Sequence, residues 1–222
     1  MRTAHFDPTP RFRPRKLTLR NGRQVTLRGI READAAEIVQ AFERLSAESR
    51  YLRFMQHKRH IDPAALHQGV RPQAGHEFVF VATVPADDGF DIVGAARYVP
   101  SSCVGGASPA PLVGAGTGRR ETECCEFAIT VAEDWRGSGL ATVLLASLVR
   151  RARHDGYHTI EGFVLADNGP MRALARRLGF QVETLPDDSG IVRVWRPLAR
   201  QQPAGRAGRG RAGGLSGRTP AR

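Results

Sequence analysis

The stretch CEFAITVAEDWRGSGLA, residues 125–141, joins a strand-like run to the start of a long helix. The run 124–131 is apolar and rich in β-type residues, which predicts a strand, and the apolar pattern of 138–154 predicts a helix. Two glycines, Gly137 and Gly139, lie where that helix begins. The first amides of a helix have no partner within it, and small residues let a phosphate approach them closely. The stretch therefore predicts a strand–turn–helix unit, whose two glycines form either a plain turn between strand and helix or a site that can hold a phosphate group.

Further strand-like and helix-like segments alternate along the chain on both sides of this unit. Gly- and Asp-containing turns at 87–89 and 187–190 each separate two β-rich runs, so we expect two hairpins. The order of elements predicts an α/β domain with a mixed, mostly antiparallel central sheet flanked by helices. The predicted strands cover 25–30, 77–84, 91–99, 124–131, 160–165, 180–185 and 191–196, and the predicted helices cover 32–45, 46–55, 63–67, 138–154 and 171–178.

The basic charge of the chain is concentrated at its two ends. The 222 residues contain 33 Lys and Arg against 22 Asp and Glu, a formal net charge of +11. Residues 1–16 contain five basic residues and one acidic residue, and residues 199–222 contain six basic residues and no acidic one. Residues 17–198 therefore contain the remaining 22 basic and 21 acidic residues. We therefore expect a flexible basic arm over 1–16, one nearly neutral folded domain over 17–198, and a disordered Gly/Arg-rich tail over 199–222. Small residues over 101–118 predict a flexible loop inserted in that domain.

Cysteine spacing and apolar runs exclude several classes of protein. Cys103, Cys124 and Cys125 form no C-x-x-C or other ligand pattern, so we expect neither a disulfide framework nor a metal site. This cysteine usage fits a reducing compartment. The longest apolar run, 140–149, is far shorter than the roughly 20 residues that cross a membrane, and the Arg/Pro-rich N-terminus is not a secretory signal. We expect a cytoplasmic protein that binds neither metal nor membrane.

Two motifs resemble those of the GCN5-related N-acetyltransferase (GNAT) superfamily. The run 136–141, Arg-Gly-Ser-Gly-Leu-Ala, resembles the loop that holds the pyrophosphate of acetyl-CoA in that family. The run 168–180, which begins with Asn and ends in Leu-Gly-Phe, resembles the family's second signature. The resemblance covers about residues 17–198 and implies a GNAT fold with acetyl-CoA as co-substrate. A closer likeness, to the bacterial Pat-like protein lysine acetyltransferases, rests on the segments 46–54, 126–131 and 166–171.

The resemblance implies a role for individual residues. Glu126 matches the strand glutamate that serves as general base in the Pat-like group, where it takes the proton that an attacking ammonium has to lose. Glu123 is the second candidate for this base. Strand alternation places Glu126 on one face with Ala128 and Thr130. The residues implied to bind the cofactor, mainly through backbone amides, are Ile129, Thr130, Val131, Arg136, Gly137, Ser138, Gly139, Leu140, Ala141, Thr142 and Asn168.

Other positions carry less specific expectations. Arg50, Tyr51 and Arg53 lie where GNAT enzymes often form the acceptor cleft, and packing is the equally supported alternative. Asn168 is expected either to cap a helix or to contact the cofactor. Many family members have a tyrosine at the position of Ala175, where it protonates the leaving thiolate, so alanine here argues against a side-chain general acid.

The sequence thus predicts an N-acetyltransferase that moves an acetyl or another short acyl group from coenzyme A to an amine, by direct attack in a ternary complex. A protein lysine is the favoured acceptor, and a small-molecule amine follows closely. An alternative of another class is a non-catalytic protein of the same fold that binds nucleic acid or a partner through its Arg-rich ends. The presence of Glu126 together with the phosphate loop favours the enzyme, and the ends are expected to add at most a weak, salt-sensitive contact with nucleic acid.

Overall fold

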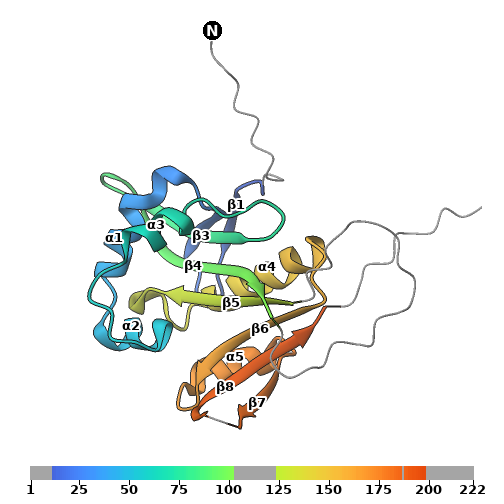
Figure 1. Ribbon diagram of the computed structural model, residues 1–222. Coiled ribbons are helices and arrows are strands. Elements are labelled where there is room, and N and C mark those ends of the chain that lie inside the picture. The colour runs from blue at the N-terminus through green and yellow to red at the C-terminus, as the bar shows by residue number, and fades with distance from the viewer. Residues whose placement is uncertain (1–11, 103–123, 187, 199–222) are drawn as a thin grey trace, which may run out of the picture.

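The computed structural model describes residues 12–102, 124–186 and 188–198, which form one sheet of eight strands with helices on both faces (Figure 1). The strands follow the order β1-β2-β3-β4-β5-β6-β8-β7 across the sheet. Their bounds are β1 Arg15–Thr18, β2 Gln24–Gly29, β3 Phe78–Ala86, β4 Gly89–Ser101, β5 Cys124–Val131, β6 Thr159–Leu165, β7 Gln181–Leu185 and β8 Asp188–Pro197. The predicted mixed, mostly antiparallel α/β fold is confirmed.

The one parallel pair of the described sheet, β5 with β6, is also its shortest contact. Only Cys124–Thr159, Cys125–Ile160 and Glu126–Glu161 are in register, although both strands continue well beyond these residues. After Glu126 the two strands diverge, as Figure 1 shows for β5 and β6. Beyond this point no described strand pairs with that edge of β5, over the second half of the strand.

The helices form two layers. α1 (Ala35–Glu43), α2 (Ala47–Phe54) and α3 (Pro63–Gly69) cover one face of the sheet, and α4 (Leu140–His154) and α5 (Gly169–Arg177) cover the other. Short 3-10 turns at Glu32–Asp34 and Glu133–Trp135 lead into the first helix and the α4 loop.

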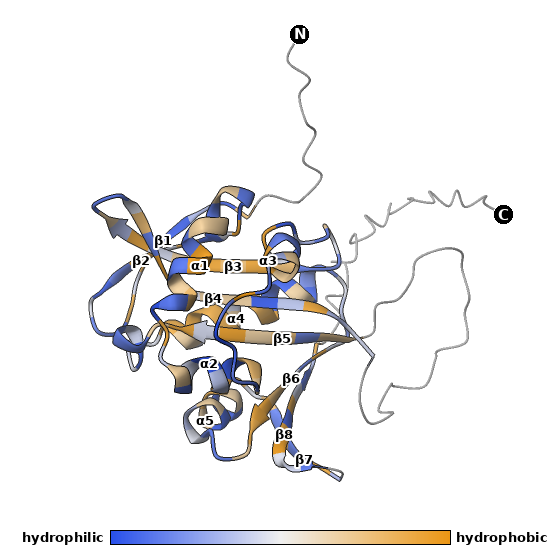
Figure 2. Cartoon of the chain, turned by 60° about the vertical axis from the view of Figure 1, so that its left-hand side comes forward, coloured by the Kyte–Doolittle hydropathy of each residue, from blue (hydrophilic) through white to orange (hydrophobic). Residues whose placement is uncertain are grey.

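The core lies mainly between the central strands and α4. Figure 2 shows hydrophobic residues concentrated along β3, β4 and β5, and Leu144, Leu145 and Leu148 of α4 are completely buried against them. Gly94 of β4 allows this close approach, because a Cβ there would lie 3.0 Å from both Leu140 and Leu144. The start of α4 is therefore held tightly against the sheet beside the divergence of β5 and β6.

The predicted boundary of the N-terminal arm at residue 16 was wrong. Phe12 packs on the rings of Phe78 and Phe80, and β1 begins at Arg15, so the ordered domain starts before Leu17. β1 is an edge strand whose residues are mostly exposed, so it lacks the alternating apolar pattern that reveals strands. Residues 103–118 of the predicted loop and the predicted tail 199–222 lie outside the described residues.

The described helices are all too short or too polar to cross a lipid bilayer. Among the residues described, no group of three or more His, Cys, Asp or Glu side chains is placed to hold a metal ion.

Candidate active site

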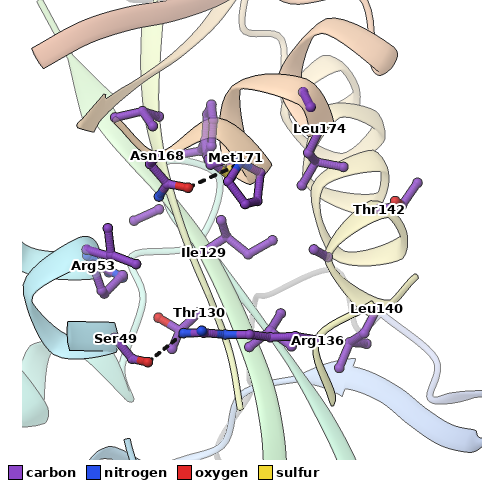
Figure 3. Close-up of a pocket in the computed structure, with 18 of the residues that line it drawn as sticks. Ser49, Arg53, Ile129, Thr130, Arg136, Leu140, Thr142, Asn168, Met171 and Leu174 are labelled. Carbon is purple, nitrogen blue, oxygen red and sulfur yellow. Dashed lines mark hydrogen bonds between the residues drawn. The ribbon is translucent and has the colours of Figure 1, made fainter. Parts of the chain in front are cut away.

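A cavity of about 640 Å³ opens where β5 and β6 diverge. Its walls come from the second half of β5, from the loop and first turn of α4, from α2 and from α5. Figure 3 shows side chains of all these elements facing one another, with Ile129 and Thr130 of β5 between α2 on one side and α4 on the other. We call this cavity the cleft. It brings together residues 49–55, 126–142 and 163–177, which are far apart in the sequence.

The amides of β5 point alternately to β4 and to the cleft. The Ala132 amide donates to the Val93 carbonyl at 3.0 Å, and the antiparallel register continues through the pair Ala95–Thr130. Because hydrogen-bonded and non-bonded pairs alternate in such a ladder, the Thr130 amide is used by β4, whereas the amides of Ile129 and Val131 face the diverged β6. Of the amides of Ile129, Thr130 and Val131, which were all expected to bind the cofactor, only those of Ile129 and Val131 therefore face the cleft. Thr130 also lines the cleft, through its side chain.

The N-terminus of α4 forms the end of the cleft nearest β1. Gly139 caps the helix in the left-handed conformation, with φ of 93°, and Gly137 has φ of 72°. The amides of Ala141 and Thr142 are in the first turn, where a helix offers no internal acceptor, and both residues line the cleft. These donors and the helix dipole favour an anionic group at this end.

The side chain of Ser138 does not face the cleft. Its side chain is buried, and its hydroxyl donates to the Trp135 carbonyl at 2.6 Å and accepts from the Leu140 amide at 3.2 Å. It therefore holds the loop in shape from behind and does not line the cleft. The motif alone could not show which of its side chains faces inward.

Arginine side chains line the cleft, and one of them lies beside the N-terminus of α4. Arg136 extends across the cleft and donates to Ser49 Oγ of α2 at 2.6 Å (Figure 3). Arg20, which follows β1, lies against Gly139: a Cβ on that glycine would be 3.6 Å from Arg20 Cγ. Arg177 of α5 lines the same cavity. Arg20 and Arg177 escaped the sequence analysis, because arginines are abundant in this chain and neither belongs to a motif.

We expect Gly139→Ala to weaken the binding of acetyl-CoA at least tenfold. The added methyl group requires the left-handed conformation, which costs about 1–2 kcal/mol for an L-residue, and it disturbs the amides that would face the pyrophosphate. Gly156→Ala is the matched control, since Gly156 has φ of 92° at the opposite end of α4. Denaturation and acetyl-CoA titration should show a similar loss of stability in both variants and a loss of affinity in Gly139→Ala alone. Equal affinities would contradict the assignment of this loop.

Glu126 lies at the point of divergence and lines the cleft. It is half-buried, and burial is the main cause that raises the pKa of its carboxyl above the ordinary value of a glutamate. The negative charge of Glu161 raises this pKa further, and the guanidinium groups of Arg53 and Arg97 oppose the rise. A carboxylate with a raised pKa accepts a proton more readily, as a general base has to.

Glu161 is a neighbour of this carboxylate that the sequence analysis missed. It is the register partner of Glu126 in β6 and is completely buried. Its carboxylate accepts from Arg193 Nε at 2.7 Å and from Ser101 Oγ at 2.9 Å. A glutamate in a strand-like run carries no sign of such a partner, which comes from a strand 32 residues further on.

Of Arg50, Tyr51 and Arg53, which were expected near the acceptor, only Arg53 lines the cavity that we call the cleft. Arg50 donates to the carbonyls of Phe42 and Glu43 at 3.2 and 2.9 Å, and so caps the end of α1. Tyr51 is exposed and stacks on His57 outside the cleft. Tyr51 lies two residues before Arg53, and side chains two apart on a helix do not share a face.

Glu133 fixes the position of α2 relative to the α4 loop. Burial alone would raise the pKa of its carboxyl, but hydrogen bonds from the Ser49 hydroxyl and the Ser46 amide outweigh burial and lower the pKa to about 2. Ser46 is itself the N-cap of α2. The carboxylate thus adds an acceptor at the N-terminus of α2, and this wall of the cleft is tied to the loop that forms its end.

Asn168 caps the N-terminus of α5 through a single side-chain atom. Its Oδ1 accepts from the Met171 amide at 3.1 Å at the start of α5, and the residue also lines the cleft (Figure 3). The two expected roles are therefore compatible, because the cap leaves the NH₂ group available. Ala175 is buried within α5, and no tyrosine or cysteine is among the described residues that line the cleft. Glu123 lies outside the described residues.

Comparison with known proteins gives one consistent family. Residues 24–181 match the family described as Acetyltransferase (GNAT) domain. The chain is 33% identical over 175 residues to Acetyltransferase PA5475 of Pseudomonas aeruginosa, with 79% of this chain and 84% of that protein covered. Its fold is similar to the GNAT domain of S. lividans PAT, with a TM-score of 0.70, 23% identity, and 83% and 97% of the two chains covered. It is also similar to yncA of Salmonella typhimurium, a putative acetyltransferase solved with its cofactor acetyl-CoA, with a TM-score of 0.57, 20% identity, and 79% and 94% coverage.

Proposed function

The chain belongs to the GNAT acetyltransferase family, and we propose that it transfers an acetyl group from acetyl-CoA to an amine with Glu126 as general base. The observation that carries this proposal is the position of Glu126. It lies where β5 and β6 diverge, in one cleft with the open amides of β5 and the N-terminus of α4. A base, hydrogen-bond donors for a carbonyl and donors for a phosphate are thus combined in a single cavity.

The residues of the cleft fit acetyl-CoA in chemistry. The amides of Ala141 and Thr142 would hold its pyrophosphate, and Arg20, Arg136 and Arg177, which line the same cavity, would add positive charge. When bound, acetyl-CoA supplies an acetyl thioester, whose carbon–sulfur bond breaks as the carbon–nitrogen bond to the acceptor forms.

The strand amides and Glu126 would act at the other end of the cleft. The amides of Ile129 and Val131 would donate to the pantetheine arm and to the thioester carbonyl. Glu126 would take the proton from the acceptor's ammonium, directly or through one water, and release it to solvent. Among the described lining residues none replaces the missing tyrosine, so the thiolate would leave without a side-chain acid.

Two classes of acceptor fit this reaction. A protein lysine is supported by the resemblance of segments 46–54, 126–131 and 166–171 to the Pat-like group. A small-molecule amine is supported by a second cavity, which shares Arg53, Ala128 and Thr130 with the cleft and is described below. A cytoplasmic location remains a prediction from the cysteine content.

We expect acetyl-CoA to raise the melting temperature of the protein by mass action. At a ligand concentration 100 times the dissociation constant the stabilisation is about 2.7 kcal/mol. Thermal melts with acetyl-CoA, with the matched control of acetate plus ATP, measure this binding, and release of free thiol on addition of amines measures the transfer. Absence of a shift at millimolar acetyl-CoA would contradict the proposal.

A further inference from the structure

A second cavity, of about 180 Å³, lies between the sheet and the layer formed by α1, α2 and α3. It shares Arg53, Ala128 and Thr130 with the cleft, so the two cavities meet at β5 next to Glu126. We call it the side pocket. Most of its wall is apolar, with Ile38, Phe54, Ile61, Leu66 and Val79 among the lining residues.

The polar part of the side pocket is cationic. Arg53, Arg97 and Lys58 line it, against one acid, Asp62. The Asp62 carboxylate accepts from the Ala65 amide at 3.1 Å as the N-cap of α3, so it is already used within the protein. The wall of the pocket therefore has an excess of positive charge.

Neither arginine is neutralised by a salt bridge with any described residue. Burial and the nearby charge of Arg97 lower the pKa of Arg53 to about 10, and Glu126 is the carboxylate that opposes this effect. Two partly buried guanidinium groups thus face one carboxylate, which the proposed reaction requires as a base. Partly buried cations in excess favour the binding of an anion, and arginine forks match a carboxylate.

The pairing of β4 with β5 determines how far the Arg97 guanidinium lies from Glu126. Arg97 of β4 is paired with Ala128, which is two residues from Glu126 on the same face of β5. Residues two apart in a strand are separated by roughly 6.6 Å along it. An anion on Arg97 would accordingly lie close to an amine on Glu126, which requires an acceptor whose amino and anionic groups are near each other.

We propose that the side pocket binds the carboxylate of a free α-amino acid through Arg97 and Arg53, encloses its apolar side chain, and presents its amino group to Glu126. This assignment rests on the proposed function, the acetyl transfer, and specifies a free α-amino acid as the acceptor. A lysine of a folded protein has no carboxylate one carbon away from its amine and does not use these contacts.

The test compares amino acids with their own amides. L-methionine, L-leucine and L-phenylalanine are assayed by thiol release beside L-methioninamide, L-leucinamide and L-phenylalaninamide, and beside a lysine peptide blocked at both ends. The amides keep the side chain and carry a less basic amine, so protonation does not favour the acids. One charged hydrogen-bonded contact predicts that kcat/KM is roughly 10- to 150-fold higher for the acids.

Variants then connect this preference to the pocket. Arg97→Met should abolish the preference by lowering kcat/KM for the acids alone, and Arg97→Lys, which keeps the charge without the fork, should recover part of it. Arg176→Met is the matched control, because Arg176 is exposed on α5 and lines neither cavity. All assays are run at a pH where the rate no longer depends on pH, and the acetyl-CoA melting shift shows that each variant retains the cleft.

The possible outcomes separate the two proposals. Preference for the acids, lost in Arg97→Met and kept in Arg176→Met, supports the side pocket as an amino-acid site. Equal use of acids and amides, faster transfer to the lysine peptide, or a preference that survives Arg97→Met overturns this inference and leaves the acetyltransferase intact. Failure to acetylate any of these amines overturns this inference, and if acetyl-CoA also fails to raise the melting temperature, the proposed function is removed as well.

Discussion

Glu126→Gln is expected to lower kcat by about 10²- to 10⁴-fold, the usual contribution of a general base. Glutamine has nearly the same shape as glutamate, so the strand, the cleft and the open amides of β5 should persist. It cannot accept a proton, and the acceptor's ammonium then stays charged and unreactive. The dissociation constant of acetyl-CoA, measured by titration of the melting temperature, should therefore remain within a few-fold of the wild-type value.

The pH dependence provides a second measure of the same residue. The base works only when ionised, so the rate falls as the pH falls through the pKa of Glu126. Burial first, and then Glu161, raise this pKa, so the acid limb of the kcat/KM profile should lie at a higher pH than an ordinary glutamate of pKa about 4.3 would give. This limb should be absent from the residual activity of Glu126→Gln.

Glu43→Gln is the matched control for both measurements, because Glu43 is exposed at the end of α1 and lines neither cavity. It should change neither kcat nor the acid limb. If Glu126→Gln retained wild-type turnover, the base would have to be another group, and Glu123, the second candidate from the sequence, would be tested next in the same way.

Glu161→Ala is expected to destabilise the protein by about 3–5 kcal/mol, the largest stability effect that we predict. The Glu161 and Arg193 side chains are 0% and 5% exposed, and removing one partner leaves the other charge buried. Glu183, whose carboxylate is 3.4 Å from Arg193 and largely exposed, compensates only in part. Urea denaturation with the midpoint and slope compared to the wild type measures the loss.

A surface pair gives the matched comparison. Arg71 and Glu32 also form an ion pair, but their side chains are 47% and 64% exposed, so Arg71→Ala should destabilise the protein far less than Glu161→Ala. Similar losses in Arg71→Ala and Glu161→Ala would contradict the importance of burial for the Glu161–Arg193 pair.

The double variant Glu161→Leu with Arg193→Met tests the electrostatic role separately from folding. Replacing both partners of a buried pair by apolar residues of similar size is often neutral for stability. With the negative charge of Glu161 removed from a folded protein, the pKa of Glu126 should fall, and the acid limb should move to lower pH. An unmoved limb would show that burial alone accounts for the raised pKa.

Much of the fold could be predicted from local sequence. The predicted strand 124–131 coincides with β5, and the loop after it leads into α4 as expected, because apolar periodicity and glycines report directly on local backbone structure. The strand β1 was missed, because its residues are mostly exposed and show no apolar pattern. The start of α4 was predicted at Ser138, two residues before the helix begins, because the turn before it is also made of small residues.

The sequence by itself thus determined the α/β fold, the phosphate loop with its glycines and the strand that carries Glu126. Each of these follows from residues that are neighbours along the chain. Only the tertiary structure decided what surrounds that glutamate: Glu161 across the parallel register, Arg53 from α2 and Arg97 from β4. It also showed that Arg50 caps α1 and that Ser138 is turned away from the cleft. The physical reason is that the burial of a carboxylate and its Coulomb energy depend on distances in space. The residues that set these distances are far apart in the sequence, so no local pattern reveals them.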